Sequence, residues 1–409
     1  MVTLEDARQM VSRWAARQST ERRHEVVPMV HEFDLGFVMW TKEPPSVLPE
    51  PGHGARTVVD RRTGVLSYWP SLPIEMIVDA YRRQVAEARP TVATIDGVAQ
   101  FRRDSRRVPA PTTAAHLTLA ADRRLRRAFG AKGDQELNHH PLVGEWIADL
   151  PAGQAVRGAE RHPELIAISD ALHEHDAAGE IRADLDAARA LFAAAALEVF
   201  PVRETGDERV TRPAYSCATC AQVRWYLGIG RDDAPPHAPV PPVFHLGRPL
   251  ALDGMAPQVR ALLAEGEVAV GSQRDGSPDE RAARLGDDLA ALGGNDLFPA
   301  GRDALLRYGG LRSRTQGPGA ALWIGPFDIG IRVPPCPQAL AGFAEVIGAR
   351  LYPIGAEHTT DAVLAVDEHG RMFALDQGGE WFLGGSVDDA VVTLARGRAQ
   401  PRVRDDGTW

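Results

Sequence analysis

Two short motifs in the middle of the chain bring together the residue types that hold a catalytic metal ion. His162 and Glu164 stand two residues apart, and Cys217 and Cys220 follow later as a Cys-x-x-Cys motif. Zinc binds imidazole and thiolate well, and a catalytic zinc keeps three protein ligands and one open position for water. The order His-x-Glu and then Cys-x-x-Cys is the arrangement of zinc deaminases. The motifs therefore predict that His162, Cys217 and Cys220 bind zinc.

Glu164 is the predicted catalytic residue because it stays outside this ligand set. Deamination needs a carboxylate that takes a proton from the metal-bound water and later delivers one to the leaving amine. Zinc makes the water available as hydroxide by lowering its pKa to about 7. Pro163 fits the first turn of one helix, and the cysteines are expected to open a second. The positive ends of both helix dipoles would then favour the negative charges of the site.

Each motif taken alone has other interpretations. A His-x-Glu pair occurs by chance in many proteins. A Cys-x-x-Cys pair can be a redox site, although no early strand followed by Trp-Cys precedes it here, or a pair of buried thiols. The two motifs in this order, each at a helix start, favour zinc over these alternatives.

Three further groups of metal-ligand residue types are interpreted as structural. The His-Glu-His run at 173–175 fits the solvated end of the first motif's helix and has no third ligand partner in the sequence. The two histidines at 139–140 are interpreted in the same way. Cys336 is predicted to be a lone thiol in a proline-rich turn.

Composition indicates a folded protein of several domains. The chain has 409 residues, 44% of them hydrophobic and 25% charged, and this length predicts two to four domains. The 46 basic and 55 acidic side chains give a formal net charge of −9, so the molecule as a whole repels a phosphate polymer. Eight arginines face two acidic residues within 101–131 and could steer a phosphate backbone, but a solvated helix face is the favoured interpretation.

The sequence predicts a cytoplasmic protein. Its N-terminus has early acidic residues and lacks the basic start and apolar core of a signal peptide. No run of about 18 apolar residues, the length of a membrane span, occurs. Three cysteines are too few for a disulfide framework.

Hydrophobic spacing and turn residues divide the chain into three folded blocks. Residues 1–85 begin with an amphipathic helix, continue with strand-like runs and close with a helix at 75–83, which predicts a small α+β domain. Residues 92–232 are predicted to form an α/β layer fold, with helices at 114–128, 165–177, 181–196 and 221–227 and a strand at 197–203.

A linker is predicted at residues 233–255, because five prolines within 233–242 exclude an ordinary helix. Residues 256–400 form the third block, which is predicted to be α+β. It has helices at 256–263, 282–292 and 303–308, and a hairpin whose strands at 363–367 and 371–375 flank a short turn.

Four segments of the middle block carry a family pattern. They are Arg-Gly at 157–158, the stretch 162–172, the Cys-Ala-Thr-Cys motif with Leu-Gly-Ile at 227–229, and His-Pro-Leu-Val at 140–143. Together they resemble the YwqJ-like deaminases of bacterial polymorphic toxin systems, over about residues 108–229. The resemblance implies a cytidine-deaminase-like α/β/α fold with zinc between two helices. The chain departs from the pattern at Ser216, where a proline is usual, and at His162, where relatives often carry cysteine.

Both flanking blocks carry family patterns as well. Segments 4–8, 37–40, 58–64 and 71–73 resemble the YrhB-type immunity family, over about residues 1–85. Segments 305–311, 351–355 and 366–371 resemble a SUKH-superfamily immunity domain, over about residues 256–397. Such domains are similar to binding modules that neutralise toxins, which implies a toxin or immunity partner and no catalytic residues in the flanks.

The leading hypothesis is a multi-domain, zinc-dependent nucleobase deaminase of a toxin and immunity system. It would have a small α+β N-terminal domain, a central cytidine-deaminase-like domain and a C-terminal α+β SUKH-like domain. Its substrate would be a base, nucleoside or single-stranded nucleic acid. The alternative is a non-catalytic immunity or decoy protein that keeps a zinc-stabilised scaffold and binds a toxin through its flanks. A structural zinc normally has four protein ligands, so the three found here favour the enzyme.

Overall fold

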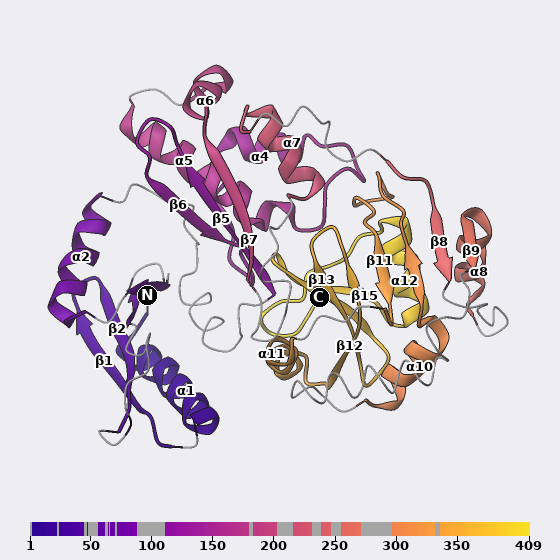
Figure 1. The fold of residues 1–409 in the computed structure, drawn as a ribbon, viewed down its shortest axis with the longest axis horizontal. Coiled ribbons are helices and arrows are strands. Elements are labelled where there is room, and N and C mark those ends of the chain that lie inside the picture. The colour runs from indigo at the N-terminus through magenta and orange to yellow at the C-terminus, as the bar shows by residue number, and fades with distance from the viewer. Residues whose placement is uncertain are drawn as a thin grey trace. The chain divides into compact units, whose positions relative to one another are not determined.

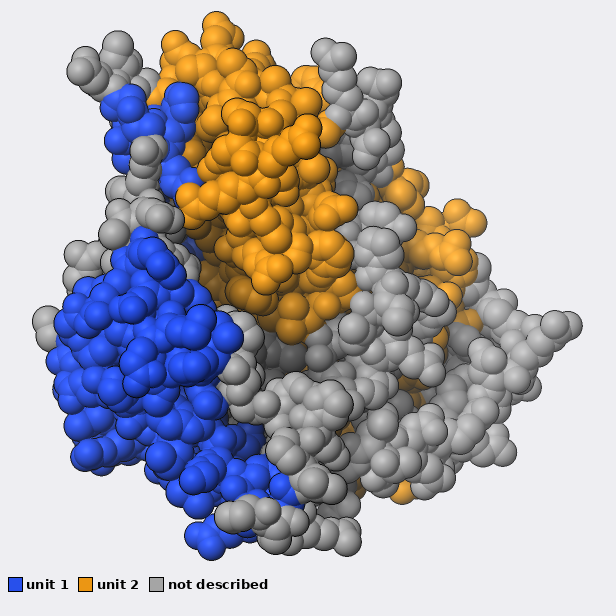
Figure 2. Space-filling model, turned by 60° about the vertical axis from the view of Figure 1, so that its left-hand side comes forward, with its two compact units in different colours: residues 1–107, 133–138, 173–180 blue, residues 108–132, 139–172, 181–409 orange. Residues whose placement is uncertain are grey.

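The computed structural model describes residues 2–22, 24–44, 47, 56–61, 64, 66–69, 72–87, 111–179, 183–202, 216–230, 239–246, 255–270, 297–331 and 336–409. The chain divides into two compact units, which Figure 2 colours separately. One unit consists of residues 1–107, 133–138 and 173–180, and the other of residues 108–132, 139–172 and 181–409. Each unit is described by itself. No helix within the described residues is both long and apolar enough to cross a membrane.

The N-terminal part is a four-stranded antiparallel sheet between two helices. Its elements are α1 (Leu4–Arg22), β1 (Val27–Phe33), β2 (Gly36–Lys42), β3 (Arg56–Asp60), β4 (Leu66–Trp69) and α2 (Ile74–Glu87), and the strands pair in chain order (Figure 1). Successive side chains of a strand point to opposite faces. Phe37 and Met39 of β2 accordingly pack with Met10 of α1, whereas Val38 packs with Ile77 of α2. The predicted helix-then-sheet order is confirmed.

The middle part has a three-stranded antiparallel sheet and several helices. Its strands lie in the order β6 (Leu125–Phe129), β5 (Thr112–Thr118) and β7 (Ala196–Val202). Its helices are α4 (Pro141–Ala148), the short 3-10 helix η1 (Ala159–Arg161), α5 (Pro163–Ala178), α6 (Leu185–Leu191) and α7 (Ala218–Tyr226). Nearly all of the first ten residues of α5 are buried, which makes this helix the centre of the middle part. The helices predicted at 165–177 and 221–227 and the strand predicted at 197–203 correspond to α5, α7 and β7.

The prediction of a helix at residues 114–128 is wrong. This segment forms β5 and β6, joined by residues 119–124, in which Arg123 has φ of 52°. Its alanines favour a helix by propensity, but helix propensity is a weak preference that tertiary contacts override. β5 pairs with strands on both of its sides, which fixes the extended conformation. The helix predicted at 181–196 is limited to α6 because Ala196 already begins β7.

Some of the arginines that were predicted to lie on a helix face therefore lie on a β-hairpin. The arginines at 123–127 lie at its turn and on β6, where Arg126 forms an ion pair of 2.7 Å with Asp122. The arginines at 102–107 and the helix predicted at 282–292 lie outside the described residues.

The C-terminal part is built on an eight-stranded sheet, here named the C-terminal sheet. Its strands lie in the order β15 (Gly379–Gly384), β14 (Met372–Asp376), β13 (Ala362–Asp367), β12 (Leu351–Glu357), β11 (Phe327–Ile329), β10 (Leu311–Ser313), β8 (Val243–Leu246) and β9 (Glu267–Val270) (Figure 1). All neighbours are antiparallel except β8 and β9. The helices are α8 (Pro257–Glu265), α10 (Pro299–Tyr308), α11 (Pro337–Ile347) and α12 (Val387–Arg396).

Both faces of the C-terminal sheet are buried by helices. Tyr352 and Leu364 belong to one core with residues of α8, α10 and α12. Val363 and Phe373 belong to a second core with Phe343 of α11. The predicted hairpin is confirmed, because Val363 of β13 pairs with Leu375 of β14. Because helices cover both faces of the sheet, every residue of β12, β13 and β14 is buried, whichever face its side chain points to.

The linker predicted at 233–255 is not wholly irregular. Residues 243–246 form β8, which pairs with β10 and β9 inside the C-terminal sheet. The prolines exclude a helix but not an extended strand, since a proline is tolerated just before a strand begins. The rest of the predicted linker, apart from 239–242 and 255, lies outside the described residues.

We predict that Phe373→Ala strongly destabilises the C-terminal part. Phe373 is fully buried, with ring centroids 5.3 Å from Phe343 and 5.7 Å from Phe382. Removing a buried phenyl ring costs about 3–5 kcal/mol of unfolding free energy, which urea denaturation measures. Ile331→Ala is the control, because Ile331 is 39% exposed and surface substitutions stay within about 0.5 kcal/mol. An equally small effect of both variants would contradict this packing.

Candidate metal centre

The two motifs lie at the N-termini of two buried helices. His162 directly precedes α5, and Pro163 is the first residue of that helix, as predicted. Cys217 is the N-cap of α7, and its sulfur accepts a hydrogen bond from the backbone N–H of Cys220. His162, Cys217 and Cys220 are between 0% and 3% exposed. Three polar side chains from two distant segments thus share one buried position.

The distances within this cluster fit a tetrahedral metal. Nδ1 of His162 lies 3.3 Å from Sγ of Cys217 and 3.5 Å from Sγ of Cys220. Zinc bonds of about 2.0 Å to nitrogen and 2.3 Å to sulfur, at a tetrahedral angle, separate the two ligand atoms by about 3.5 Å. All three ligand atoms lie within 4.8 Å of one another, and no other such group of His, Cys, Asp and Glu occurs in the described part of the chain.

The pKa values of all three side chains in the cluster are strongly shifted. Burial lowers the pKa of His162, but the charge and the hydrogen bond of Cys217 outweigh it and raise that pKa to about 9. Burial raises the pKa of the Cys217 thiol, but contacts with Cys220 and His162 hold it well below its usual value. The pKa of Cys220 is raised by burial and by the neighbouring thiolate. A bound cation would neutralise these sulfurs and keep both cysteines deprotonated.

Glu164 stands in the first turn of α5 and is 1% exposed. Its Oε2 atom is buried and has no hydrogen-bond partner among the residues that the structure describes. Burial raises the pKa of this carboxyl, and the positive charge of His162 opposes the shift. A buried carboxylate oxygen with no partner is rare unless a ligand or water binds there. Glu164 can therefore accept or hold a proton at Oε2.

Two contacts outside the ligand positions hold the first turn of α7 in place. Thr219, between the cysteines, accepts a hydrogen bond of 2.9 Å at Oγ1 from the backbone N–H of Val156. Arg224, further along α7, donates one of 2.8 Å to Oγ of Ser216. Ser216 is the position where the family pattern has proline, so a side-chain contact shapes this turn. Neither contact has a signal in local sequence spacing.

The other histidines and the third cysteine considered as metal ligands contact the backbone or lie at the start of a helix. His140 is fully buried and caps α4, accepting at Nδ1 from the backbone N–H of Leu142. Nε2 of His173 lies 2.9 Å from the carbonyl oxygen of Asn138. Cys336 is the buried N-cap residue of α11.

A cavity of about 250 Å³ lies beside α4 and α7. Its lining residues are Leu142, Glu145, Trp146, Asp149, Leu150 and Tyr226. None of the four predicted site residues lines it.

Three family models match consecutive parts of the chain. The immunity protein 35-like domain matches residues 5–89, the YwqJ-like deaminase matches residues 98–225, and the SUKH-3 immunity protein matches residues 255–397. These matches confirm the three resemblances and the predicted order of one deaminase between two immunity-type domains. The deaminase match spans all four predicted site residues. Among curated proteins and solved structures, none gives a significant match to the chain.

We predict that the purified chain binds one thiolate-seeking divalent ion, such as Zn²⁺ or Co²⁺, and that a double Cys217→Ser, Cys220→Ser variant binds none. The variant loses two of the three ligand atoms of the cluster. Elemental analysis measures the number of metal ions per chain, in samples whose circular dichroism spectra show that parent and variant are equally folded. Cys336→Ser is the control, because it removes the third buried thiol and leaves the cluster intact. Equal metal content in the double variant and the parent would exclude this ligand set.

Proposed function

We propose that the chain is a zinc-dependent deaminase of a bacterial toxin and immunity system, with His162, Cys217 and Cys220 as ligands. The observation that carries this proposal is the N–S–S cluster with tetrahedral spacing, two residues from a buried carboxyl group whose Oε2 atom has no hydrogen-bond partner among the described residues. The match to the YwqJ-like deaminase family supports the reaction class. The proposed reaction adds water to the amine-bearing carbon of a base, breaks the carbon–nitrogen bond and releases ammonia.

Zinc would supply an activated water at its open fourth position. In this proposal Glu164 moves the protons. Its Oε2 atom takes the proton from water as the oxygen attacks, and returns it to the departing amine nitrogen. Burial excludes bulk water from this transfer, since Glu164 is 1% exposed. The N-termini of α5 and α7 lie at the cluster, where their positive dipole ends would favour the negative charges of the thiolates and of an attacking oxygen.

The three-ligand set favours an enzyme over a zinc-stabilised scaffold. A structural zinc site is closed by a fourth protein ligand. In the described ranges no further His or Cys joins His162, Cys217 and Cys220. The open position is therefore proposed to be the place of the reacting water.

We propose a nucleobase as the substrate, either free or within single-stranded nucleic acid. Nucleobases carry the exocyclic amine that deaminases of this motif order remove. Arg123, Arg124 and Arg127 lie at the hairpin of β5 and β6 and would add local positive charge. The net charge of −9 confines any attraction of a phosphate backbone to such a local surface.

The flanking immunity-type domains are proposed to bind a toxin or immunity partner protein. We further propose a cytoplasmic location. Metal binding by Cys217 and Cys220 requires both thiols to stay reduced, and the cytoplasm maintains that state.

We predict that Glu164→Gln lowers turnover at least about a hundredfold and leaves zinc bound, because it removes the proton carrier and spares all three ligands. Ammonia release from cytosine and adenine nucleosides, single-stranded DNA and RNA measures turnover, and elemental analysis measures zinc. Glu160→Gln is the control, since the Glu160 side chain is 48% exposed. Full activity in Glu164→Gln would rule out the proposed proton transfer.

A further inference from the structure

Arg157 is a buried cation that belongs to the family pattern at 157–158 but to neither of the two metal-ligand motifs. It is 4% exposed and stands five positions before His162. Only η1, a single turn that starts after Gly158, separates the two residues. The position of Arg157 therefore limits where the His162 backbone can lie.

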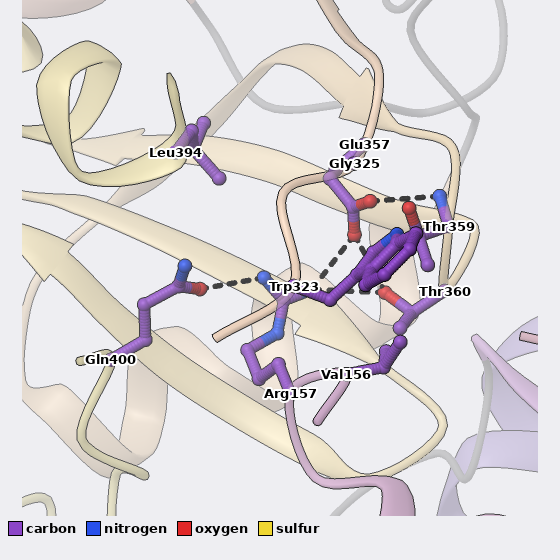
Figure 3. A pocket seen from close by; sticks show the side chains of 9 residues that line it. All are labelled: Val156, Arg157, Trp323, Gly325, Glu357, Thr359, Thr360, Leu394 and Gln400. Carbon is purple, nitrogen blue, oxygen red and sulfur yellow. Dashed lines mark hydrogen bonds and ion pairs between the residues drawn. The ribbon is translucent and has the colours of Figure 1, made fainter. Parts of the chain in front are cut away.

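Among the described residues, every side chain that hydrogen-bonds to the Arg157 guanidinium comes from the C-terminal part. Asp376 of β14 accepts at Oδ2 from Nε at 3.0 Å and from Nη2 at 2.7 Å. Glu357 of β12 accepts from Nη2 at 3.1 Å, and Thr360 accepts at 2.9 Å. Gln400 accepts from Nη1 at 2.6 Å. Figure 3 shows the guanidinium between Gln400 and Glu357.

These partners are as buried as the arginine. Asp376 is 0% exposed, Glu357 4%, Thr360 5% and Gln400 9%. The cavity that remains among them has a volume of about 10 Å³, room for no more than one water molecule. A buried ion pair that loses one partner leaves an uncompensated charge, so the contact resists opening.

The residues around Arg157 also join the two parts through the backbone. Gly153 donates to the carbonyl of Ala321 and accepts from the N–H of Gly319, at 3.1 and 3.2 Å. The N–H of Trp323 donates to Ala155 at 2.8 Å. A Cβ atom on Gly158, whose φ is 61°, would lie 2.4 Å from the Trp381 ring, so only glycine fits there.

The same segment contacts the cysteine motif. Val156, the neighbour of Arg157, donates its N–H to Thr219 between Cys217 and Cys220. One short stretch, residues 153–158, thus touches the C-terminal sheet on one side and the ligand-bearing turn of α7 on the other. It then continues directly into His162.

We infer that Arg157 is a positioning residue of the metal centre, through which the C-terminal sheet holds the segment that leads into His162. The inference rests on the proposed metal centre. Under it the immunity-type C-terminal part belongs to the structure of the deaminase site and is not only a binding module. Arg157 itself touches neither metal nor substrate.

Asp376→Asn is the sharpest test, because it removes one charge and almost no volume. Oδ1 of Asp376 accepts from the N–H of Gly378 and from Nε1 of Trp381, at 2.8 and 3.0 Å. An asparagine that keeps these two bonds presents its NH₂ group to Arg157, where a donor faces a donor. The variant therefore breaks the contact with Arg157 and preserves the local turn of the C-terminal sheet. Arg157→Met breaks the same contact from the other side.

Two measurements on the full chain report the metal centre without relying on activity. The first is the rate at which excess chelator removes bound zinc, and the second is the visible absorption spectrum of the Co²⁺-loaded chain, which reports ligand geometry. Both variants should release zinc about tenfold faster, the lower end of the loss in metal affinity when a group that orients a metal ligand is removed, and their Co²⁺ spectra should change. Arg350→Met is the matched control, because Arg350 pairs with Glu368 on the surface of the same part.

Folded Asp376→Asn that releases zinc at the parent rate with the parent Co²⁺ spectrum would overturn the inference and leave the metal centre standing. A parent chain that takes up neither ion would overturn the metal centre as well. If Arg350→Met released zinc as fast as Asp376→Asn, the inference about Arg157 would also be overturned, because the faster release would then reflect general destabilisation.

Discussion

Burial of charge is the physical constraint on which the middle and C-terminal parts depend. An imidazole, two thiols, a carboxyl and a guanidinium lie within one region and are almost completely removed from water. Each costs several kcal/mol to bury unless it is paired. Arg157 is compensated by Asp376 and Glu357, and the imidazole of His162 and the sulfur of Cys217 compensate one another. The helices, the turn of α7 and the C-terminal sheet are arranged so that these partners meet.

The sequence was sufficient to predict which side chains gather in the candidate metal centre, because each of its two motifs is short. Residue types and spacing predicted both helix starts and the three ligand positions, and the structure brings their ligand atoms together. The order of the three domains was also predictable, since short family patterns survive in each block. The hairpin of β13 and β14 followed from a turn between two apolar runs. Each of these patterns is short, although the two motifs of the candidate metal centre are 55 residues apart along the chain.

The predictions that were wrong, or absent, depend on distant partners. The alanine-rich segment 114–128 is extended because β6 and β7 pair with β5 on both sides, which no local propensity contains. β8 forms beside prolines because β10 and β9 supply its hydrogen bonds. Arg157 is one of many arginines in the sequence, and only the fold shows that its acceptors come from β12, β14 and Gln400.

The separation of Arg157 from its acceptors has a consequence for the order of synthesis. All three proposed ligands have been translated by residue 220, whereas the last acceptor, Gln400, follows Arg157 by 243 residues. A growing chain therefore carries every proposed site residue long before Arg157 has all of its acceptors. On the inferred coupling, the proposed metal centre gains its full support only after Gln400 has been translated. The fully supported centre would then exist only in a chain that also carries the immunity-type part.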